Sequence, residues 1–227
     1  MDIAVVNIPC EIDREQLLQK LHIKPNSPFM EKVDKMITQA LEVGKPKIAY
    51  KLSYIEEKGD DYVLVDGIKF SSRVLRVNLE ETFKVVPFVV TCGRELEEWA
   101  KTFTDMFDTF CADGIMEGVL RAARNRIFPE IDQEFNLGHT SNMYPGSLSD
   151  WPIKEQKPLF ELLGDVQSLI GVELLPSFLM SPIKTVSGFH FPKEGSFESC
   201  QLCPRQDCPG RKAPYDKNLY AEKYEQK

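Results

Sequence analysis

The sequence lacks the features of a secreted or membrane-spanning chain. Its first ten residues do not show the charged and then apolar segment of a signal peptide. Its longest strongly apolar run, around residues 85–90, is far too short to cross a bilayer. We therefore expect a cytoplasmic protein with reduced thiols and no membrane partner.

The sequence also lacks a surplus of basic residues and the common catalytic motifs. Its 28 Lys and Arg residues against 35 Asp and Glu residues give a net charge of -7, whereas nucleic-acid binding needs a positive surface. The three histidines show no H-E-x-x-H spacing and no Ser-His-Asp order, and G-x-G-x-x-G and P-loop motifs are absent. We predict no nucleic-acid partner and no catalytic residue, and leave open whether the chain is an enzyme.

Strands are predicted where apolar and β-branched residues run together between turn residues. The predicted strands are residues 3–8, 50–55, 62–65, 68–70 and 85–90, with further paired strands within 174–191. Turns are predicted at Lys58-Gly59-Asp60, Asp66-Gly67, Pro182 and Gly188.

Helices are predicted where apolar residues repeat at helical spacing after a capping residue. They are expected to begin at Asp13, after Ser27-Pro28, after Ser71-Ser72 and at Asp150-Trp151-Pro152, and the second should end at Gly44. A long helical region should span about 95–127, with a break near Asp113-Gly114 and an end at Pro129, and residues 128–150 should form a loop.

The order of these elements predicts the fold class. Strands and helices mix without a steady βαβ alternation, which favours an α+β fold with an antiparallel β-sheet and helices. We expect one domain over residues 1–195, followed by a loosely packed tail, 196–227, that contains a cluster of cysteines.

Three of the six cysteines, Cys200, Cys203 and Cys208, lie within nine residues. Iron–sulfur clusters are held by thiolates at such spacings, and a Cys-Pro step also ends the bacterial ferredoxin motif. Structural zinc uses similar spacings but usually has four ligands, and only three are visible here. An Fe–S cluster is the favoured prediction, with zinc and an unmetalled tail as alternatives. Cys92 and Cys111 are predicted to be core residues.

Residues 141–152, Ser-Asn-Met-Tyr-Pro-Gly-Ser-Leu-Ser-Asp-Trp-Pro, are the most unusual stretch. A Pro-Gly turn exposes backbone N–H and C=O groups that can bind a ligand. The alternative is a connector that ends in a helix cap.

From this loop onward the sequence resembles the activation (reactivation) domain of cobalamin-dependent methionine synthase. The resemblance rests on Tyr144-Pro145-Gly146, residues 152–163, residues 171–180 and Val186-Ser187-Gly188-Phe189-His190-Phe191. It extends upstream to Val89-Val90-Thr91-Cys92-Gly93 and to a long central helix from residue 113 to 127, and covers roughly residues 60–192.

The resemblance implies an α+β domain that binds S-adenosylmethionine and docks over a cobalamin-carrying domain. There, an electron from a flavodoxin-type donor and a methyl group from S-adenosylmethionine restore oxidised cob(II)alamin. The family's loop reads Arg-x-x-Pro-Gly-Tyr, and in that register this chain has Asn142 and Ser147. Because Asn cannot replace a guanidinium as a carboxylate clamp, we expect weaker binding. The candidate cofactor-binding residues are Glu117, Asn142, Tyr144, Pro145, Gly146 and Ser147.

The sequence has no Asp-x-His-x-x-Gly cobalamin signature, so we expect cobalamin only through a partner. That partner would be a corrinoid-binding methyltransferase, or a methionine synthase lacking its own activation domain, with a flavodoxin or ferredoxin as electron donor. The docking face should include residues 138–151, with the apolar residues Met143, Tyr144 and Trp151. The chain would then be a stand-alone variant with a C-terminal Cys motif. The alternative is a non-catalytic binding module with a structural zinc or Fe–S site.

Overall fold

The computed structural model describes residues 2–193, 197–205, 207–208, 211 and 213–224. Within these residues, eight strands form one antiparallel sheet around the central strand β6 (Lys84–Thr91). On one edge of β6 lies β10 (Thr185–Pro192), followed by β7 (Thr140–Met143). The other edge is shared by two strands, each of which starts its own branch of the sheet.

The two branches have different lengths. β2 (Lys47–Tyr50) pairs with the end of β6 and then with β1 (Ala4–Asn7). β3 (Ser53–Lys58) pairs with the beginning of β6, and β4 (Tyr62–Val65) and β5 (Ile68–Ser71) follow it. A separate small hairpin joins β8 (Glu173–Leu174) to β9 (Met180–Ser181).

Helices cover both faces of the sheet, so both faces of β6 are buried. Val86, Phe88 and Val90 face the first cluster of core residues, and Val85 and Val89 face the second. The first face carries α1 (Arg14–Lys20), α2 (Met30–Val43), α4 (Arg94–Ala100) and α5 (Met106–Glu134). The second carries α3 (Arg73–Asn78), α6 (Gln156–Leu163) and α7 (Val166–Ile170). A strand that is covered on both sides reads as a continuous apolar run, as this one does.

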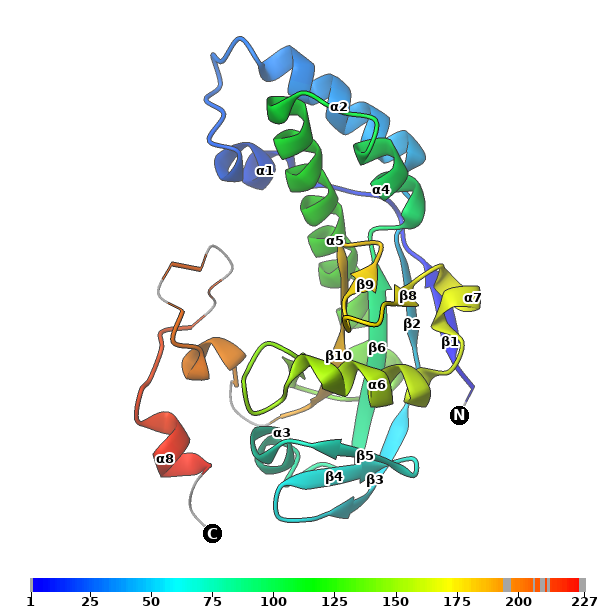
Figure 1. Cartoon of the computed structure of the whole chain (residues 1–227), viewed down its shortest axis with the longest axis vertical. Helices are drawn as coiled ribbons and strands as arrows, with labels where there is room; N and C mark the ends of the chain where they lie inside the picture. Colours follow the sequence, from blue (N-terminus) through cyan, green and yellow to red (C-terminus); the bar gives the residue numbers. More distant parts are fainter. Residues whose placement is uncertain (1, 194–196, 206, 209–210, 212, 225–227) are drawn as a thin grey trace.

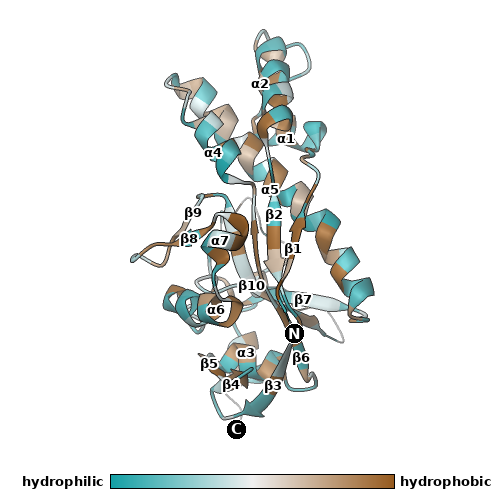
Figure 2. Ribbon diagram, turned by 90° about the vertical axis from the view of Figure 1, so that its right-hand side faces the viewer, coloured by the Kyte–Doolittle hydropathy of each residue, from teal (hydrophilic) through white to brown (hydrophobic). Residues whose placement is uncertain are grey.

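The helices are gathered unevenly along the molecule. In Figure 1, α1, α2, α4 and the first part of α5 lie together at one end, and α3, α6 and the β3–β5 strands lie towards the other. Figure 2 colours the ribbon by hydropathy, and brown apolar and teal hydrophilic residues alternate along α5. α5 thus runs from the helical end of the molecule down along the sheet.

The structure confirms the α+β class and many local predictions. Strands occur at or near each predicted position, and the turns at residues 58–60 and 66–67 join β3 to β4 and β4 to β5. Asp13 caps α1 by accepting a hydrogen bond from the Gln16 N–H (3.0 Å), and Ser72 caps α3 in the same way through Leu75 (2.9 Å). Gly44 ends α2.

The prediction for the long helical region was wrong in its details. The break lies at residues 101–105, where Asp105 caps a new helix through the Phe107 N–H (3.0 Å). α5 then continues through Gly114 and past Pro129 to Glu134. Gly114 is a contact point, since a Cβ there would lie 2.8 Å from a Leu21 methyl carbon. Pro129 removes one backbone donor, but the helix continues because residues on its buried side, such as Ile127 and Ile131, pack in the core.

Three further predictions of caps and turns need correction. α2 begins at Met30 without a side-chain cap, so Ser27-Pro28 does not start it directly. Asp150 does not cap the helix after it: its carboxylate accepts the Ser72 hydroxyl and the Val74 N–H (2.9 Å) at the start of α3. The segment 128–150 is not a loop throughout, since it contains the end of α5 and strand β7. The short helix η1 (Ile153–Glu155) precedes α6.

The C-terminal tail is more closely packed than expected. It contains the short helices η2 (Ser199–Leu202) and α8 (Leu219–Lys223). Phe197 and Tyr224 are buried in the second core cluster, and the Tyr224 hydroxyl donates to the Asn78 side chain (3.3 Å). The predicted domain boundary at residues 195–196 falls outside the described residues. No helix in the described part of the chain is long and apolar enough to span a bilayer.

Candidate functional site

The Pro-Gly loop follows β7 and is closed by its own backbone. The Gly146 N–H donates to the Trp151 carbonyl (2.7 Å), and the Ser147 N–H donates to the Tyr144 carbonyl (3.1 Å). Gly146 has a φ of 86°, and a Cβ there would lie 3.1 Å from the Ile153 Cβ. The turn therefore favours a residue without a side chain. Tyr144, Pro145, Gly146 and Ser147 form one compact unit, in which the Gly146 and Ser147 N–H groups are bonded to backbone carbonyl groups of the same segment.

Two of the three apolar residues expected on the docking face lie in the core instead. Met143 and Trp151 are both 0% exposed. Trp151 packs against Phe189, with ring centroids 5.5 Å apart, and Tyr144 is partly buried on the opposite face. The exposed residues of the segment 138–151 are Gly138, His139, Gly146, Ser147 and Ser149. What this segment offers to a partner is therefore mainly polar side chains and backbone.

Tyr144 is positioned by a glycine in the neighbouring strand. Gly188 lies within β10, not at a turn as predicted, and pairs with Phe88 of β6. A Cβ on Gly188 would lie 2.2 Å from the Met143 carbonyl oxygen and 3.0 Å from Tyr144 Cδ1. The missing side chain lets the end of β7 and the Tyr144 ring lie directly against β10.

The Tyr144 hydroxyl contacts Arg124 of α5. Arg124 Nη2 donates to the Tyr144 hydroxyl oxygen (2.5 Å), and its guanidinium carbon lies 5.3 Å from the Tyr144 ring centroid and 5.8 Å from that of Phe128. Arg124 Nε is buried and has no hydrogen-bond partner. Among the described residues, no carboxylate lies within ion-pair distance of this guanidinium. Burial raises the pKa of Tyr144, although the Arg124 charge opposes this effect.

Asn142 is engaged by a buried histidine. His190 lies opposite Asn142 in the β7–β10 pair. Its Nδ1 is 3.0 Å from Asn142 Oδ1, and its Nε2 is 2.6 Å from Asp132 Oδ1 at the end of α5. The His190 ring also stacks on Phe128, with centroids 4.7 Å apart. These contacts join β7, β10 and α5 just before the Pro-Gly loop.

We expect the free energy of unfolding to fall as the pH is lowered from 7 to 5, in part through His190. Burial lowers the pKa of His190, and the Asp132 carboxylate only partly opposes this. The unfolded chain, with a histidine pKa near 6.5, then binds the proton more readily than the folded chain. The stabilisation is complete above that unfolded pKa and is lost as the pH falls, with a slope of at most about 1.4 kcal/mol per pH unit.

Urea denaturation of the wild type and of His190→Gln at pH 5, 6 and 7 measures this effect. The variant should show a flatter dependence on pH. His139→Gln, at an exposed position, is the matched control and should keep the wild-type slope. Equal slopes in all three proteins would contradict the assignment.

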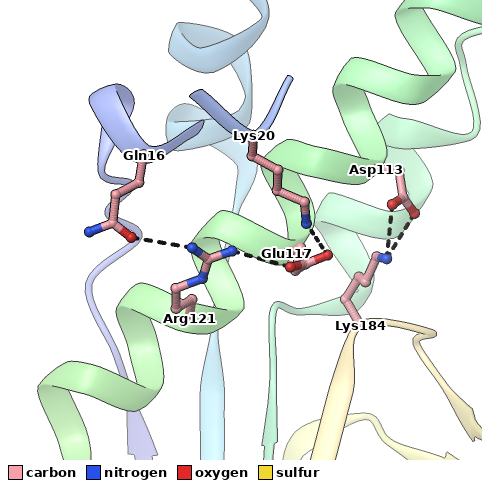
Figure 3. A network of polar contacts seen from close by, with 6 residues as sticks. All are labelled: Gln16, Lys20, Asp113, Glu117, Arg121 and Lys184. Atoms are coloured by element: carbon pink, nitrogen blue, oxygen red, sulfur yellow. Dashed lines mark hydrogen bonds and ion pairs between the residues drawn. The ribbon is translucent and has the colours of Figure 1, made fainter. Parts of the chain in front are cut away.

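Glu117 belongs to a different set of contacts on α5. It forms ion pairs with Lys20 and with Arg121 (3.2 Å), and Arg121 also contacts the Gln16 side chain (3.2 Å) (Figure 3). Burial alone would raise the pKa of Glu117, but the Lys20 ammonium and the other nearby cations lower it below its ordinary value. Nearby, Lys184 pairs with Asp113 (2.9 Å).

The candidate residues are therefore brought together only in part. The loop residues and Asn142 are adjacent, whereas Glu117 precedes Arg124 by seven residues, about 10 Å along the helix axis, and its charge is already paired. Sequence reasoning missed Arg124, Asp132, Gly188 and His190 as residues that position the loop. One signal was available in the sequence. Residues 113, 117, 121, 124, 128 and 132 repeat at helical spacing, which places them on one side of a helix.

The three clustered cysteines are not gathered into a metal site in the described residues, where no group of three or more potential metal ligands was found. Instead, the Arg211 guanidinium holds the segment through backbone carbonyl groups, those of Cys200 (2.9 Å), Cys203 (3.1 Å), Arg205 and Ala213 (3.1 Å). Pro209, part of the Cys-Pro step, lies outside the described residues. The Fe–S or zinc centre stays a prediction from sequence, and we derive no chemistry from it.

Comparisons with known proteins define the fold. No protein-family model matches the chain, and no curated protein matches its sequence. Among solved structures, a crystal structure of the MetH reactivation domain bound to AdoHcy is similar, with a TM-score of 0.61 and 16% sequence identity. The match covers 88% of this chain and 81% of that one. The chain thus has the fold of a methionine synthase reactivation domain.

Proposed function

We propose that this chain is a reactivation component for a cobalamin-dependent methyltransferase such as methionine synthase. It would bind S-adenosylmethionine along the Pro-Gly loop and support the reductive methylation of cob(II)alamin. The observation that carries the proposal is the likeness over 88% of the chain to a reactivation domain that was crystallised with AdoHcy. The closed Tyr144-Pro145-Gly146 turn beside α5 supports it, because the sequence resemblance is centred on this turn.

The proposed reaction needs a reductant and a methyl donor. One electron from a flavodoxin or ferredoxin converts cob(II)alamin, the substrate, to cob(I)alamin. The cobalt then forms a bond to the methyl carbon while the sulfur–carbon bond of S-adenosylmethionine breaks, and S-adenosylhomocysteine leaves. The residues of this chain would bind and orient the methyl donor, so their contribution is positioning rather than proton transfer.

Cobalamin would be held outside these 227 residues, which contain no Asp-x-His-x-x-Gly sequence. We propose that a partner corrinoid protein carries it and that docking is transient, because the same cobalt must also meet its other substrates. The exposed backbone and polar residues of segment 138–151 would form part of the docking face. This is a polar contact surface, unlike the apolar one expected from the sequence.

We expect this protein to accelerate the return of methylcobalamin on a corrinoid methyltransferase in the cob(II) state. The assay mixes both proteins with a reductant and S-adenosylmethionine and follows methylcobalamin absorbance. Mixtures without the chain, without the reductant or without S-adenosylmethionine serve as controls. Recovery no faster than without the chain, across corrinoid partners, would contradict the proposal and favour the non-catalytic binding module.

A further inference from the structure

We propose that Arg124, together with the Tyr144 hydroxyl, binds the carboxylate of the methyl donor. This inference rests on the proposed function, because it names the residues by which the same site would recognise S-adenosylmethionine. The proposed carboxylate-binding arginine lies on helix α5, whereas most of the candidate residues from the resemblance lie at residues 142–147.

The charge of Arg124 is unpaired in a region where other arginines are paired. On the same helix, Arg121 pairs with Glu117, and Arg126 pairs with Glu11 (3.3 Å). Within the described residues, the partners recorded for Arg124 are one phenol oxygen and two aromatic rings, and its Nε has no acceptor. A buried donor without an acceptor costs about 1–3 kcal/mol. A carboxylate would satisfy this donor and the charge at once, since a guanidinium offers two parallel donors.

Tyr144 provides a second donor at the same place. Its hydroxyl oxygen already accepts a hydrogen bond from Arg124, so its own hydrogen remains to be donated. Because burial raises the pKa of this phenol, it keeps that hydrogen at neutral pH. The guanidinium and the hydroxyl are held together by a 2.5 Å contact and can therefore serve the same carboxylate.

The position relative to the loop fits this role. Asn142 and Tyr144 both contact the α5 side of the sheet, and Phe128 lies between His190, which holds Asn142, and Arg124. The guanidinium thus lies on the same side of the sheet as the side chain of residue 142. Glu198 lies near enough to influence Tyr144, but its carboxylate is used to cap η2. A ligand carboxylate would meet a cation without a dedicated partner.

The test compares S-adenosylmethionine with decarboxylated S-adenosylmethionine, which differ only in the carboxylate, by titration calorimetry. Wild-type protein should prefer the carboxylated ligand by about 10- to 100-fold, as expected for a charge-assisted hydrogen bond. Arg124→Gln should bind S-adenosylmethionine about 10- to 100-fold more weakly and should bind the decarboxylated ligand as the wild type does. Tyr144→Phe should lose a smaller part of the preference.

Arg126→Gln is the matched control, because Arg126 is an exposed arginine on the same helix, and it should keep the wild-type preference. Melting curves show whether each variant is folded, and Arg124→Lys keeps the charge if the glutamine variant is unstable; it should retain only part of the preference. Equal weakening of both ligands in Arg124→Gln, or no weakening, would overturn the inference while leaving the proposed function in place. Binding of neither ligand by the wild type would overturn both.

Discussion

Replacing Trp151 by alanine is expected to lower the free energy of unfolding by about 3–5 kcal/mol. The Trp151 side chain is fully buried and packs against Phe189 in the core between the sheet and α6. Its backbone also closes the Pro-Gly turn by accepting the Gly146 N–H (2.7 Å). The cavity left by the ring would therefore lie directly beneath the loop.

Two variants show whether burial is the cause. Trp151→Phe should cost clearly less than Trp151→Ala, because a phenyl ring still fills most of the site and the Trp151 Nε1, which has no hydrogen-bond partner, is removed. Ile153→Ala, two residues away at a 40% exposed position, should cost less than about 1 kcal/mol. Urea denaturation measures all three. If Trp151→Ala costs no more than Ile153→Ala, Trp151 lies on the surface, as the docking-face expectation had it.

The local prediction of strands and turns succeeded where the signal is contained in a few neighbouring residues. The run Val85–Val90 marks a strand because both of its faces are covered. The Asp66-Gly67 turn is readable because Gly67 takes a φ of 80°, which few other residues adopt. Asp13 and Ser72 act within three residues of the N–H groups that they cap.

Local signals failed where a contact with a distant part of the chain determines the local structure. Gly114 and Pro129 predict helix ends, yet α5 continues because its buried side packs along the sheet. Gly188 predicts a turn, but it is required for the contact with Met143. Asp150 predicts the start of the next helix, but it caps α3, 76 residues earlier in the sequence. In each case the residue type indicated a turn, a helix end or a cap, and the fold determined the role that the residue has.

The candidate site also has a part that the sequence could predict and a part that it could not. The loop residues 144–147 are contiguous, so the sequence could name them together. Arg124 is 20 residues away from Tyr144, and Asp132 is 58 residues away from His190. Such pairs depend on how α5 lies against β10, which no local pattern specifies. Glu117, by contrast, was named from a resemblance, and its charge is met by Lys20, from a helix that lies outside that resemblance.

Replacing Gly188 by alanine is expected to destabilise the protein by about 1–3 kcal/mol and to weaken ligand binding at the Pro-Gly loop. The new Cβ would lie 2.2 Å from the Met143 carbonyl oxygen. That oxygen belongs to the backbone of β7, so it cannot rotate away as a side chain would, and β7 must separate locally from β10. Tyr144 is the next residue and its ring would be displaced from Arg124, because the same Cβ approaches Tyr144 Cδ1 to 3.0 Å.

Gly118→Ala provides the matched control. A Cβ on Gly118 would also meet close atoms, Ile12 Cδ1 at 2.7 Å and Ile12 Cγ1 at 2.9 Å, but both belong to one side chain, which can shift, and not to the backbone. Gly118 lies inside α5, where alanine favours the helix by up to about 1 kcal/mol. We therefore expect Gly118→Ala to be near neutral in urea denaturation and to bind S-adenosylmethionine as the wild type does. If Gly188→Ala matches this control in both stability and affinity, the close contact between β7 and β10 does not position the loop. A loss of affinity in Gly188→Ala beyond that of Tyr144→Phe would show instead that the strand contact positions the whole loop and not only one hydroxyl group.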